Sequence, residues 1–279
     1  MRLLYAMLGI FMIAQLLGIF TGLVVLTDVT RNPYIASLLV TTDSEDPMNA
    51  IVFIVYILIG AAVMIALIRY FKVFPLLFRL MEFMMISTSS SIVFYSFFRF
   101  FAGYEASMLA GIIVALVFSA AKNFYPQLKN SAAVLATAGV GVIFGMSLGL
   151  FPLVLFLIFL SIYDFLAVFK TKHMVEMAEF IVKKDMAFTV TAKAPPARPG
   201  EKEQRLDLGT GDMIAPIMLE VSALAISPVA TLFVFIGAVI SLGLFLILVF
   251  RKKMILPALP PIVLGMVVSL LAGFLLGFY

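Results

Sequence analysis

The chain has 279 residues and a formal net charge of +4; 64% of its residues are hydrophobic, 12% are charged, and its mean hydropathy is +1.19. Soluble domains are roughly 45–50% apolar, so this composition excludes an ordinary soluble protein and predicts an integral membrane protein. There is no cysteine and a single histidine, His173, which excludes thiolate catalysis, disulfides and two-histidine metal sites. We therefore expect no metal or other cofactor. The positive charge requires no nucleic acid, because basic residues also set membrane topology and bind anionic lipid headgroups.

Apolar segments that approach or exceed the roughly 20 residues of a membrane-spanning helix recur along the whole chain. The first segment is followed by more of the same, so we expect it to be a permanent span and not a cleaved signal. The predicted fold is all-α, a multi-pass membrane protein with nine spans. These are Leu3–Leu26, Ile51–Ile68, Phe74–Phe98, Ser107–Ala121, Ala132–Leu150, Pro152–Phe169, Met213–Ile226, Val229–Phe250 and Ile255–Phe278.

Two of these segments contain polar or small residues with a structural explanation. Arg79 and Glu82 lie three residues apart near the start of the third segment, where they can pair on one helix face. In the fifth segment Gly141, Gly145 and Gly149 recur every four residues. This spacing predicts a face on which another helix packs closely.

Lysine and arginine are unevenly distributed between the two sides of the predicted membrane. With a cytoplasmic amino terminus, all of the 19 basic residues except Arg31 and Arg99 fall on the cytoplasmic side. The first outer loop is then acidic, with Asp28, Asp43, Glu45 and Asp46. The sequence therefore predicts a cell-membrane protein whose amino terminus is cytoplasmic and whose carboxyl terminus is extracytoplasmic.

The connection at residues 170–211 is unlike the others. It separates spans one to six, in residues 1–169, from spans seven to nine, in residues 212–279. Within it, PPARPGEK predicts a mobile linker. The β-branched and aromatic residues of MAFTVTA, residues 186–192, could pair with RLDL as a hairpin around this linker. An unstructured loop is the alternative.

Asp164 interrupts the apolar run of the sixth segment, where an aspartate costs roughly 2.5–3.5 kcal/mol on insertion scales. It precedes Lys170 by six residues, or about 9 Å of helix rise, so it lies in the apolar zone near the cytoplasmic face. No basic residue is available at that depth to pair with it. Asp212, in GTGD at the start of the seventh segment, is expected at a similar depth on an antiparallel helix. Glu220 lies roughly 12 Å deeper and is the poorer match.

Two carboxylates brought together in a low-dielectric site cannot both ionise readily, so they share one proton. That state suits an aspartic protease, in which one carboxylate takes a proton from water and the other polarises the scissile carbonyl. Gly209 and Gly211 flank Asp212 and would allow unusual backbone angles or close approach of another chain. Asp212 could instead simply cap the seventh helix. Asp164 cannot be a cap, because it lies within a continuous apolar helix.

Prolines cluster where the ninth segment begins, in ILPALPPI. Pro260 and Pro261 cannot donate helical hydrogen bonds, which predicts irregular backbone with free carbonyl groups beside Pro257, Ala258 and Leu259. Such backbone is tolerated at membrane depth where it is buried in protein or lines a wet cavity. A helix that merely starts at a proline is the alternative.

Three motifs together resemble the presenilin and signal peptide peptidase family of intramembrane aspartyl proteases. They are YD at residues 163–164, GxGD at residues 209–212 and PAL at residues 257–259, and their order and placement cover nearly the whole chain. The resemblance implies that Asp164 and Asp212 are the catalytic pair. It also implies active-site support from Tyr163, Gly209 and Gly211 and substrate binding by Pro257, Ala258 and Leu259.

Within this family the predicted orientation and the PALPPI sequence are more similar to presenilins than to signal peptide peptidases. The short tails and short loop are similar to compact presenilin-type proteases of archaea, which implies that accessory subunits are not required. The implied substrates are membrane-spanning helices of other proteins in the lipid bilayer. Such a helix must unwind before water can attack, and MAFTVTA with the PAL backbone could receive the extended stretch by strand addition.

Some of the same residues also occur in proteins with other functions. Paired intramembrane acids also mark ion-coupled transporters, but no inverted repeat is visible and both acids lie near one face. GMSLG at residues 145–149 matches the G-x-S-x-G pattern of serine hydrolases, but no span contains a histidine to act as base. Prepilin peptidases share GxGD but lack the YD and PAL motifs. A non-catalytic relative that retains the fold is a further alternative.

Overall fold

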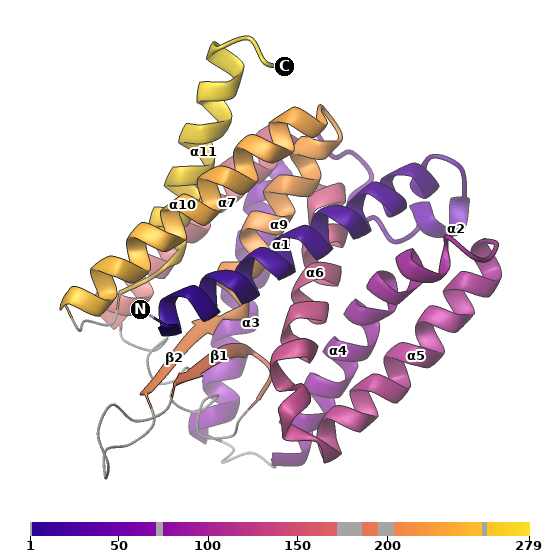
Figure 1. Cartoon of the computed structure of the whole chain (residues 1–279), viewed down its shortest axis with the longest axis horizontal. Helices are drawn as coiled ribbons and strands as arrows, with labels where there is room; N and C mark the ends of the chain where they lie inside the picture. Colours follow the sequence, from indigo (N-terminus) through magenta and orange to yellow (C-terminus); the bar gives the residue numbers. More distant parts are fainter. Residues whose placement is uncertain (1, 71–74, 172–185, 195–203, 253–255) are drawn as a thin grey trace.

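The structure is a computed structural model that describes residues 2–70, 75–171, 186–194, 204–252 and 256–279. It is a bundle of helices with one small hairpin at one end (Figure 1). The long helices are α1 (Arg2–Val29), α3 (Met48–Tyr70), α4 (Pro75–Phe98), α5 (Tyr104–Phe124), α6 (Lys129–Ser147), α7 (Leu150–Leu166), α9 (Thr210–Leu224), α10 (Pro228–Lys252) and α11 (Leu259–Leu275). The short elements are α2 (Pro33–Ala36), the 3₁₀ turn η1 (Pro126–Leu128), the π-helical turn η2 (Ala167–Thr171), β1 (Thr189–Ala194) and β2 (Gln204–Gly209).

The predicted all-α fold is confirmed, and each of the predicted apolar segments falls on one of the long helices. In the described part of the chain, seven helices are long and apolar enough to cross a membrane: α1, α3, α4, α5, α6, α7 and α10. The other two, α9 and α11, have 15 and 17 residues. At 1.5 Å per residue they are roughly 23 and 26 Å long, somewhat less than a hydrocarbon core of about 30 Å.

Helix α9 forms the centre of the bundle and packs against α6, α10 and α1, with α7 and α11 in further contact (Figure 1). Its neighbours meet it with glycines. A Cβ atom added at Gly145 of α6 would lie 2.6 Å from the carbonyl oxygen of Met218, and one added at Gly22 of α1 would lie 2.9 Å from Val221. These distances leave no space for any larger residue, so small residues set how closely the helices approach.

The predicted glycine face of α6 is confirmed for two of its three members. Gly141 lies against Ile217 and Gly145 against Met218, both on α9. Gly149 is different, because it follows the end of α6 and lies against the carboxylate of Glu45. The four-residue spacing fails there because the helix has already ended at Ser147.

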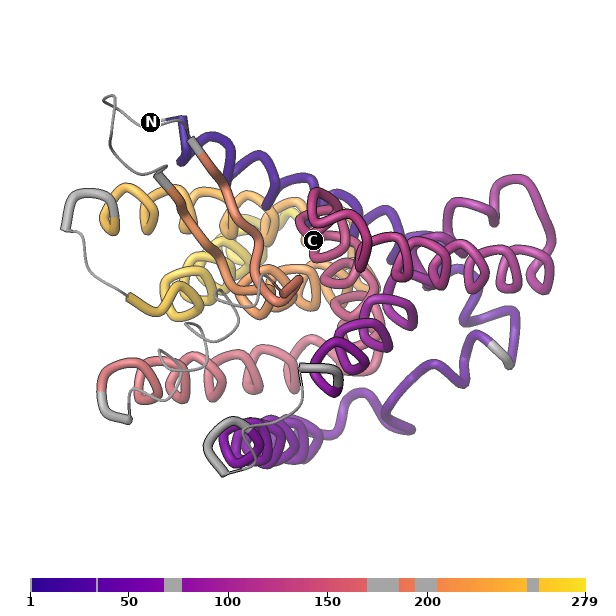
Figure 2. Tube along the Cα trace, turned by 90° about the horizontal axis from the view of Figure 1, so that it is seen from below, coloured from indigo at the N-terminus to yellow at the C-terminus, as the bar shows by residue number. Residues whose placement is uncertain are grey.

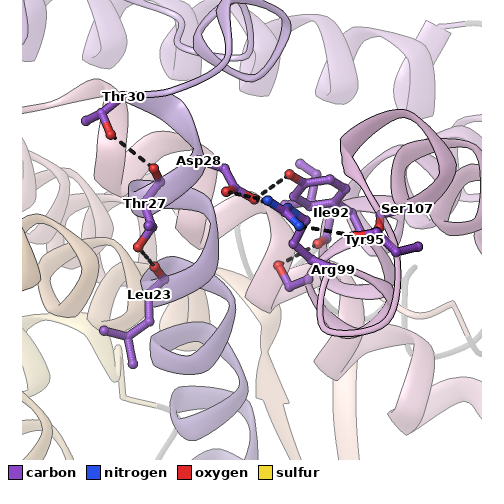
Figure 3. Close-up of polar contacts among 10 residues, drawn as sticks. Leu23, Thr27, Asp28, Thr30, Ile92, Tyr95, Arg99 and Ser107 are labelled. Atoms are coloured by element: carbon purple, nitrogen blue, oxygen red, sulfur yellow. Dashed lines mark hydrogen bonds and ion pairs between the residues drawn. The ribbon is translucent and has the colours of Figure 1, made fainter.

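The last turns of α1 and α4 and the first turn of α5 are joined by a buried polar cluster (Figure 3). Asp28, which the sequence places in an outer loop, lies in the last turn of α1 and is buried. Its carboxylate accepts hydrogen bonds from the Tyr95 hydroxyl at 2.6 Å and from Arg99 Nε at 2.9 Å (Figure 3). The Arg99 guanidinium also lies 3.9 Å above the ring of Tyr104. One of the two basic residues predicted on the outer side is therefore held by a buried acid.

At the opposite end of α4 the predicted pair of Arg79 and Glu82 is wrong. Glu82 is buried and pairs with Lys122 of α5, whereas Arg79 is exposed. Helices α4 and α5 are connected by a short turn and pack along their length, so Lys122 returns to the level of Glu82. The partner of Glu82 is thus set by the helix that packs beside α4 and not by closeness in sequence.

The predicted hairpin is confirmed. Strands β1 and β2 pair antiparallel from Thr189 opposite Gly209 to Ala194 opposite Gln204. The first strand begins at Thr189, three residues later than the predicted Met186. The hairpin packs against α1 and α6, and Figure 2 shows it beside the start of α1. PPARPGEK and His173 lie outside the described residues.

Candidate active site

Asp164 lies in the last turn of α7 and is only 7% exposed. The neighbouring Tyr163 is half-buried and interacts electrostatically with it. Directly after Asp164 the helix widens into the π-helical turn η2, and the N–H of Ala167 donates to the carbonyl groups of Tyr163 and Asp164. Single π turns occur often at functional sites. The sequence gives no signal for this turn, because its residues continue the same apolar helical pattern.

Asp212 is the third residue of α9, and the residue at the N-cap is Gly209. The alternative that Asp212 is itself the cap is therefore wrong. Its side chain instead turns back to accept a hydrogen bond from the backbone N–H of Gly209. This is the contact that the third residue makes in a capping box. It holds the carboxylate at the helix entrance, where the side chain is half-buried.

The structure brings the two predicted aspartates together. Helices α7 and α9 pack against each other, and the carboxylates of Asp164 and Asp212 lie close enough to interact electrostatically. Glu220 lies two turns farther along α9 and is fully buried. Neither of its carboxylate oxygens has a hydrogen-bond partner among the described residues. Of the two acids on α9, Asp212 is therefore the one near Asp164, as its predicted depth in the membrane indicates.

The two glycines of GTGD differ from what their residue type suggests. Gly209 has ordinary extended angles, with φ −65° and ψ 143°, and Gly211 does not have positive φ, so unusual backbone angles are absent at both. The open space is present: a Cβ atom at Gly211 would meet no atom within 4 Å. Gly211 lines an apolar cavity of about 460 Å³ together with Tyr56 of α3, Phe144 of α6 and Leu160 of α7.

The PAL segment lies at the start of α11. Leu259 is the first helical residue and Ala258 the N-cap, so the alternative of a helix that begins at prolines is right from Leu259 onward. Irregular backbone is confined to the preceding residues. The carbonyl groups of Leu256 and Pro257 can receive no helical hydrogen bond, because the residues four positions later are Pro260 and Pro261.

This segment faces the end of α7. Pro257, Pro260 and Pro261 line a cavity of about 660 Å³ whose other wall includes Phe165, before the π turn, and Phe169, within it. Ala258 and Leu259 are buried in the core of the bundle. The PAL segment thus lies beside the helix that carries Asp164. The described residues that line the cavity between them include no charged side chain.

The remaining candidate chemistry has structural explanations. Ser147 of GMSLG is fully buried; its hydroxyl donates to the Ile143 carbonyl at 2.7 Å and accepts from the Val40 N–H at 2.9 Å. These two hydrogen bonds hold the end of α6 against the segment at Val40, so the hydroxyl has a structural role. Among the described residues no group of three or more acidic or histidine side chains could hold a metal ion.

Sequence reasoning missed the side chains that hold the hairpin. Asn130, at the start of α6, donates from Nδ2 to the Thr191 carbonyl at 2.8 Å and accepts from the Thr191 N–H at 3.0 Å. Glu82 accepts a hydrogen bond from the N–H of Ala187. These partners come from helices more than 60 residues away in the sequence, and no local pattern marks them.

The comparisons with known proteins agree with this geometry. Two solved structures titled as presenilin family intramembrane aspartate proteases, one in space group C222 and one in P2, are similar over nearly the whole chain. The first has a TM-score of 0.70 and 23% identity, covering 98% of this chain and 99% of the other. The second has a TM-score of 0.65 and 25% identity, covering 95% and 97%.

A search of curated protein sequences gives no match. The family model described as signal-peptide peptidase, presenilin aspartyl protease matches residues 8–278. That match spans the YD, GxGD and PAL motifs and every long helix of the structure. The chain therefore belongs to the signal-peptide peptidase and presenilin family of aspartyl proteases, and it is an aspartic endopeptidase of the intramembrane type.

Proposed function

We propose that the protein hydrolyses peptide bonds within membrane-spanning helices of other proteins, by a water molecule activated between Asp164 and Asp212. The observation that carries this proposal is the meeting of two acids from α7 and α9 at the end of the bundle where the hairpin enters α9. In a low-dielectric site such a pair holds one proton between its two members. One member is then a base and the other an acid in the same site.

The reaction follows from that single shared proton. The ionised carboxylate takes a proton from water as the water oxygen attacks the scissile carbonyl carbon, while the protonated carboxyl donates a hydrogen bond to the carbonyl oxygen. The tetrahedral intermediate then collapses as the C–N bond breaks, and the leaving nitrogen takes the proton that the first carboxylate removed from water, which returns the pair to its starting state. Tyr163, Gly209 and Gly211 support the pair by flanking it, and Gly211 leaves space beside it for the substrate.

We propose nine membrane crossings with the amino terminus in the cytoplasm and the carboxyl terminus outside. The distribution of lysine and arginine supports this orientation, as does the arrangement of Asp28 and Arg99 at the end of the bundle opposite the hairpin. The aspartates then lie near the cytoplasmic face, and the shorter helices α9 and α11 both begin there.

Strand β2 is the better candidate than β1 for receiving the unwound substrate. The outer edge of β1 is occupied, because Glu82 binds the N–H of Ala187 and Asn130 binds both backbone groups of Thr191. Backbone groups alternate in direction along an antiparallel strand, so Asp207, opposite Thr191, directs its N–H and C=O away from β1. Among the described residues neither group has a hydrogen-bond partner, and this free edge of β2 leads directly to Gly209 and Asp212. We therefore expect strand addition at β2, the partner of the strand formed by MAFTVTA.

The two apolar cavities give the substrate places for its side chains. One lies beside Gly211, and the other lies between the PAL residues and the π turn after Asp164. In this account Pro257 contributes to substrate binding through the second cavity and through its carbonyl group, which receives no helical hydrogen bond. Ala258 and Leu259 are buried in the core and hold this segment in place. We expect cleavage to require neither a nucleic acid nor an accessory subunit.

The test of the proposed function uses the purified chain alone in detergent with a reporter protein that has a single membrane-spanning helix. We expect two fragments whose new ends, located by mass spectrometry, lie within the apolar stretch. The absence of cleavage under conditions where a proton or sodium gradient drives flux into vesicles would favour an ion-coupled transporter instead.

Strand addition has its own test in Asp207→Pro. Proline removes the N–H that faces the free edge but no bond of the hairpin, and cleavage should fall about tenfold, the effect of losing roughly one backbone hydrogen bond to the substrate. Asp207→Ala is the control, because it loses the carboxylate contacts with Thr191 and Arg205 but keeps the N–H. Equal cleavage by the two variants would exclude pairing at this edge.

A further inference from the structure

Helices α4 and α5 carry a buried ion pair at the end of the bundle where the hairpin lies. Glu82 of α4 and Lys122 of α5 have side chains that are only 3% and 9% exposed, and Lys122 Nζ donates to Glu82 Oε1. Neither helix contributes to the pair of aspartates. A lone buried pair of this kind contributes little to stability compared with apolar packing, so stability alone does not explain it.

The same carboxylate oxygen that binds Lys122 also holds the chain that leads into the hairpin. Glu82 Oε1 accepts a hydrogen bond from the backbone N–H of Ala187, a fully buried residue two positions before β1. This hydrogen bond is made to the carboxylate of an ion pair, and hydrogen bonds with an ionised partner are shorter and stronger than those between neutral groups.

The hold on Ala187 lies next to the entrance of α9. The next residue, Phe188, accepts hydrogen bonds at 3.1 Å from both the backbone N–H and the hydroxyl of Thr210. Thr210 is the first residue of α9, two positions before Asp212. A continuous series of contacts therefore runs from Glu82 through Ala187 and Phe188 to the start of the helix that carries Asp212.

We propose that Glu82 and Lys122 form a clasp that positions the hairpin and the entrance of α9 for proteolysis. The inference rests on the proposed function. Glu82 and Lys122 are positioning residues, because they touch neither the aspartates nor the free edge of β2. The clasp fixes the base of β1, and through the pairing of Thr189 with Gly209 it fixes where a substrate strand on β2 meets Asp212. Its loss should therefore change which peptide bonds are cut as well as how fast.

The test compares two double variants that both remove the two buried charges. Glu82→Gln with Lys122→Met keeps an oxygen that can accept from Ala187, whereas Glu82→Met with Lys122→Met does not. Arg79→Met, at an exposed position one turn before Glu82, is the control for altering the surface of α4. The readouts are the ratio of cleavage positions in the reporter and hydrogen exchange of the peptide containing Ala187.

We expect the variant with methionine at both positions to exchange the Ala187 amide about tenfold faster, the effect of losing roughly one hydrogen bond of 1.4 kcal/mol. It should also shift the ratio of cleavage positions. The variant with glutamine should keep both near those of the unaltered protein. Ala187→Pro removes the donor while leaving the ion pair, and it should shift the cleavage positions in the same way if the double methionine variant does not fold.

Two results would overturn the clasp. One is an unchanged ratio of cleavage positions in both the double methionine variant and Ala187→Pro, with only the total rate lowered, as general destabilisation would cause. The other is equal exchange at Ala187 in the two double variants. If the unaltered protein cuts no reporter, the proposed function fails instead, and the exchange experiment still decides whether Glu82 holds the hairpin.

Discussion

The two halves of α9 are built in opposite ways. In its first turn, Gly211 is exposed with no atom near a hypothetical Cβ, and Asp212 is half-buried. From Ile217 to Ala223 every side chain is buried, and glycines of α1 and α6 press against the helix. The packed half fixes the helix in the bundle, and the open half leaves its entrance accessible. A rigid helix with one open end can hold a catalytic group in place and still admit a substrate.

The two acids of this helix show what the difference means for chemistry. Asp212, in the open half, meets Asp164 and the N–H of Gly209. Glu220, in the packed half, has no partner for either oxygen among the described residues. A buried acid without a partner is stable in its neutral form, because an isolated charge is very costly in an apolar interior. In the proposed mechanism Asp212 shares a proton with Asp164, whereas Glu220 has no second acid beside it among the described residues.

The largest expected effect separates these two acids. Asp212→Asn should lower cleavage by about 10³-fold or more, because it removes one of the two groups that handle the proton. Glu220→Gln makes the same chemical change in the packed half and should keep cleavage within about twofold, because a neutral acid and an amide are equivalent there. Initial rates on the reporter measure both. A large loss of cleavage in Glu220→Gln would mean that the packed half takes part in chemistry or in ion movement.

A smaller effect is expected from adding one methyl group on the packed side. Gly145→Ala places a Cβ within 2.6 Å of the Met218 carbonyl oxygen, so α6 and α9 must move apart. Overpacking of this kind costs about 1–3 kcal/mol, and the thermal midpoint measured by circular dichroism in detergent should fall by several degrees. An unchanged midpoint would show that the contact between α6 and α9 is looser than the structure indicates.

The same substitution in the open half should have the smallest effect on stability. Gly211→Ala meets no atom within 4 Å and needs no positive φ, so the thermal midpoint should stay the same or rise. The gain in the free energy of unfolding is at most about 1 kcal/mol, the difference in helix propensity between glycine and alanine. Cleavage should still fall, by less than about 10²-fold, because the methyl group enters the space beside Asp212. If Gly211→Ala were as destabilising as Gly145→Ala, the two halves of α9 would not differ in packing.

The sequence predicts those features that depend on distance along one helix or on local composition. The meeting of Asp164 and Asp212 followed from counting helix rise from the basic residues that mark the membrane face. The hairpin followed from the β-branched and aromatic residues of MAFTVTA on one side of a Pro- and Gly-containing linker, with RLDL on the other. The packing role of Gly141 and Gly145 followed from their spacing alone.

Features that depend on which helix faces which could not be predicted in this way. Glu82 was assigned to Arg79 because they are close in sequence, yet its partners Lys122 and Ala187 lie 40 and 105 residues away. Helices that are apolar on all sides do not reveal their facing residues, since the lipid and the protein core are equally apolar. Asp28 was assigned to a loop because the sequence does not mark the last turn of α1.

The most direct test of the central claim is cleavage of the single-span reporter in water labelled with oxygen-18, by the unaltered protein and by Asp164→Asn. A water activated between Asp164 and Asp212 predicts that each new carboxyl terminus carries one solvent oxygen, that the cut lies within the span, and that Asp164→Asn forms no product although it remains folded. Product formed by folded Asp164→Asn, or product from the unaltered protein without the label, would contradict the account.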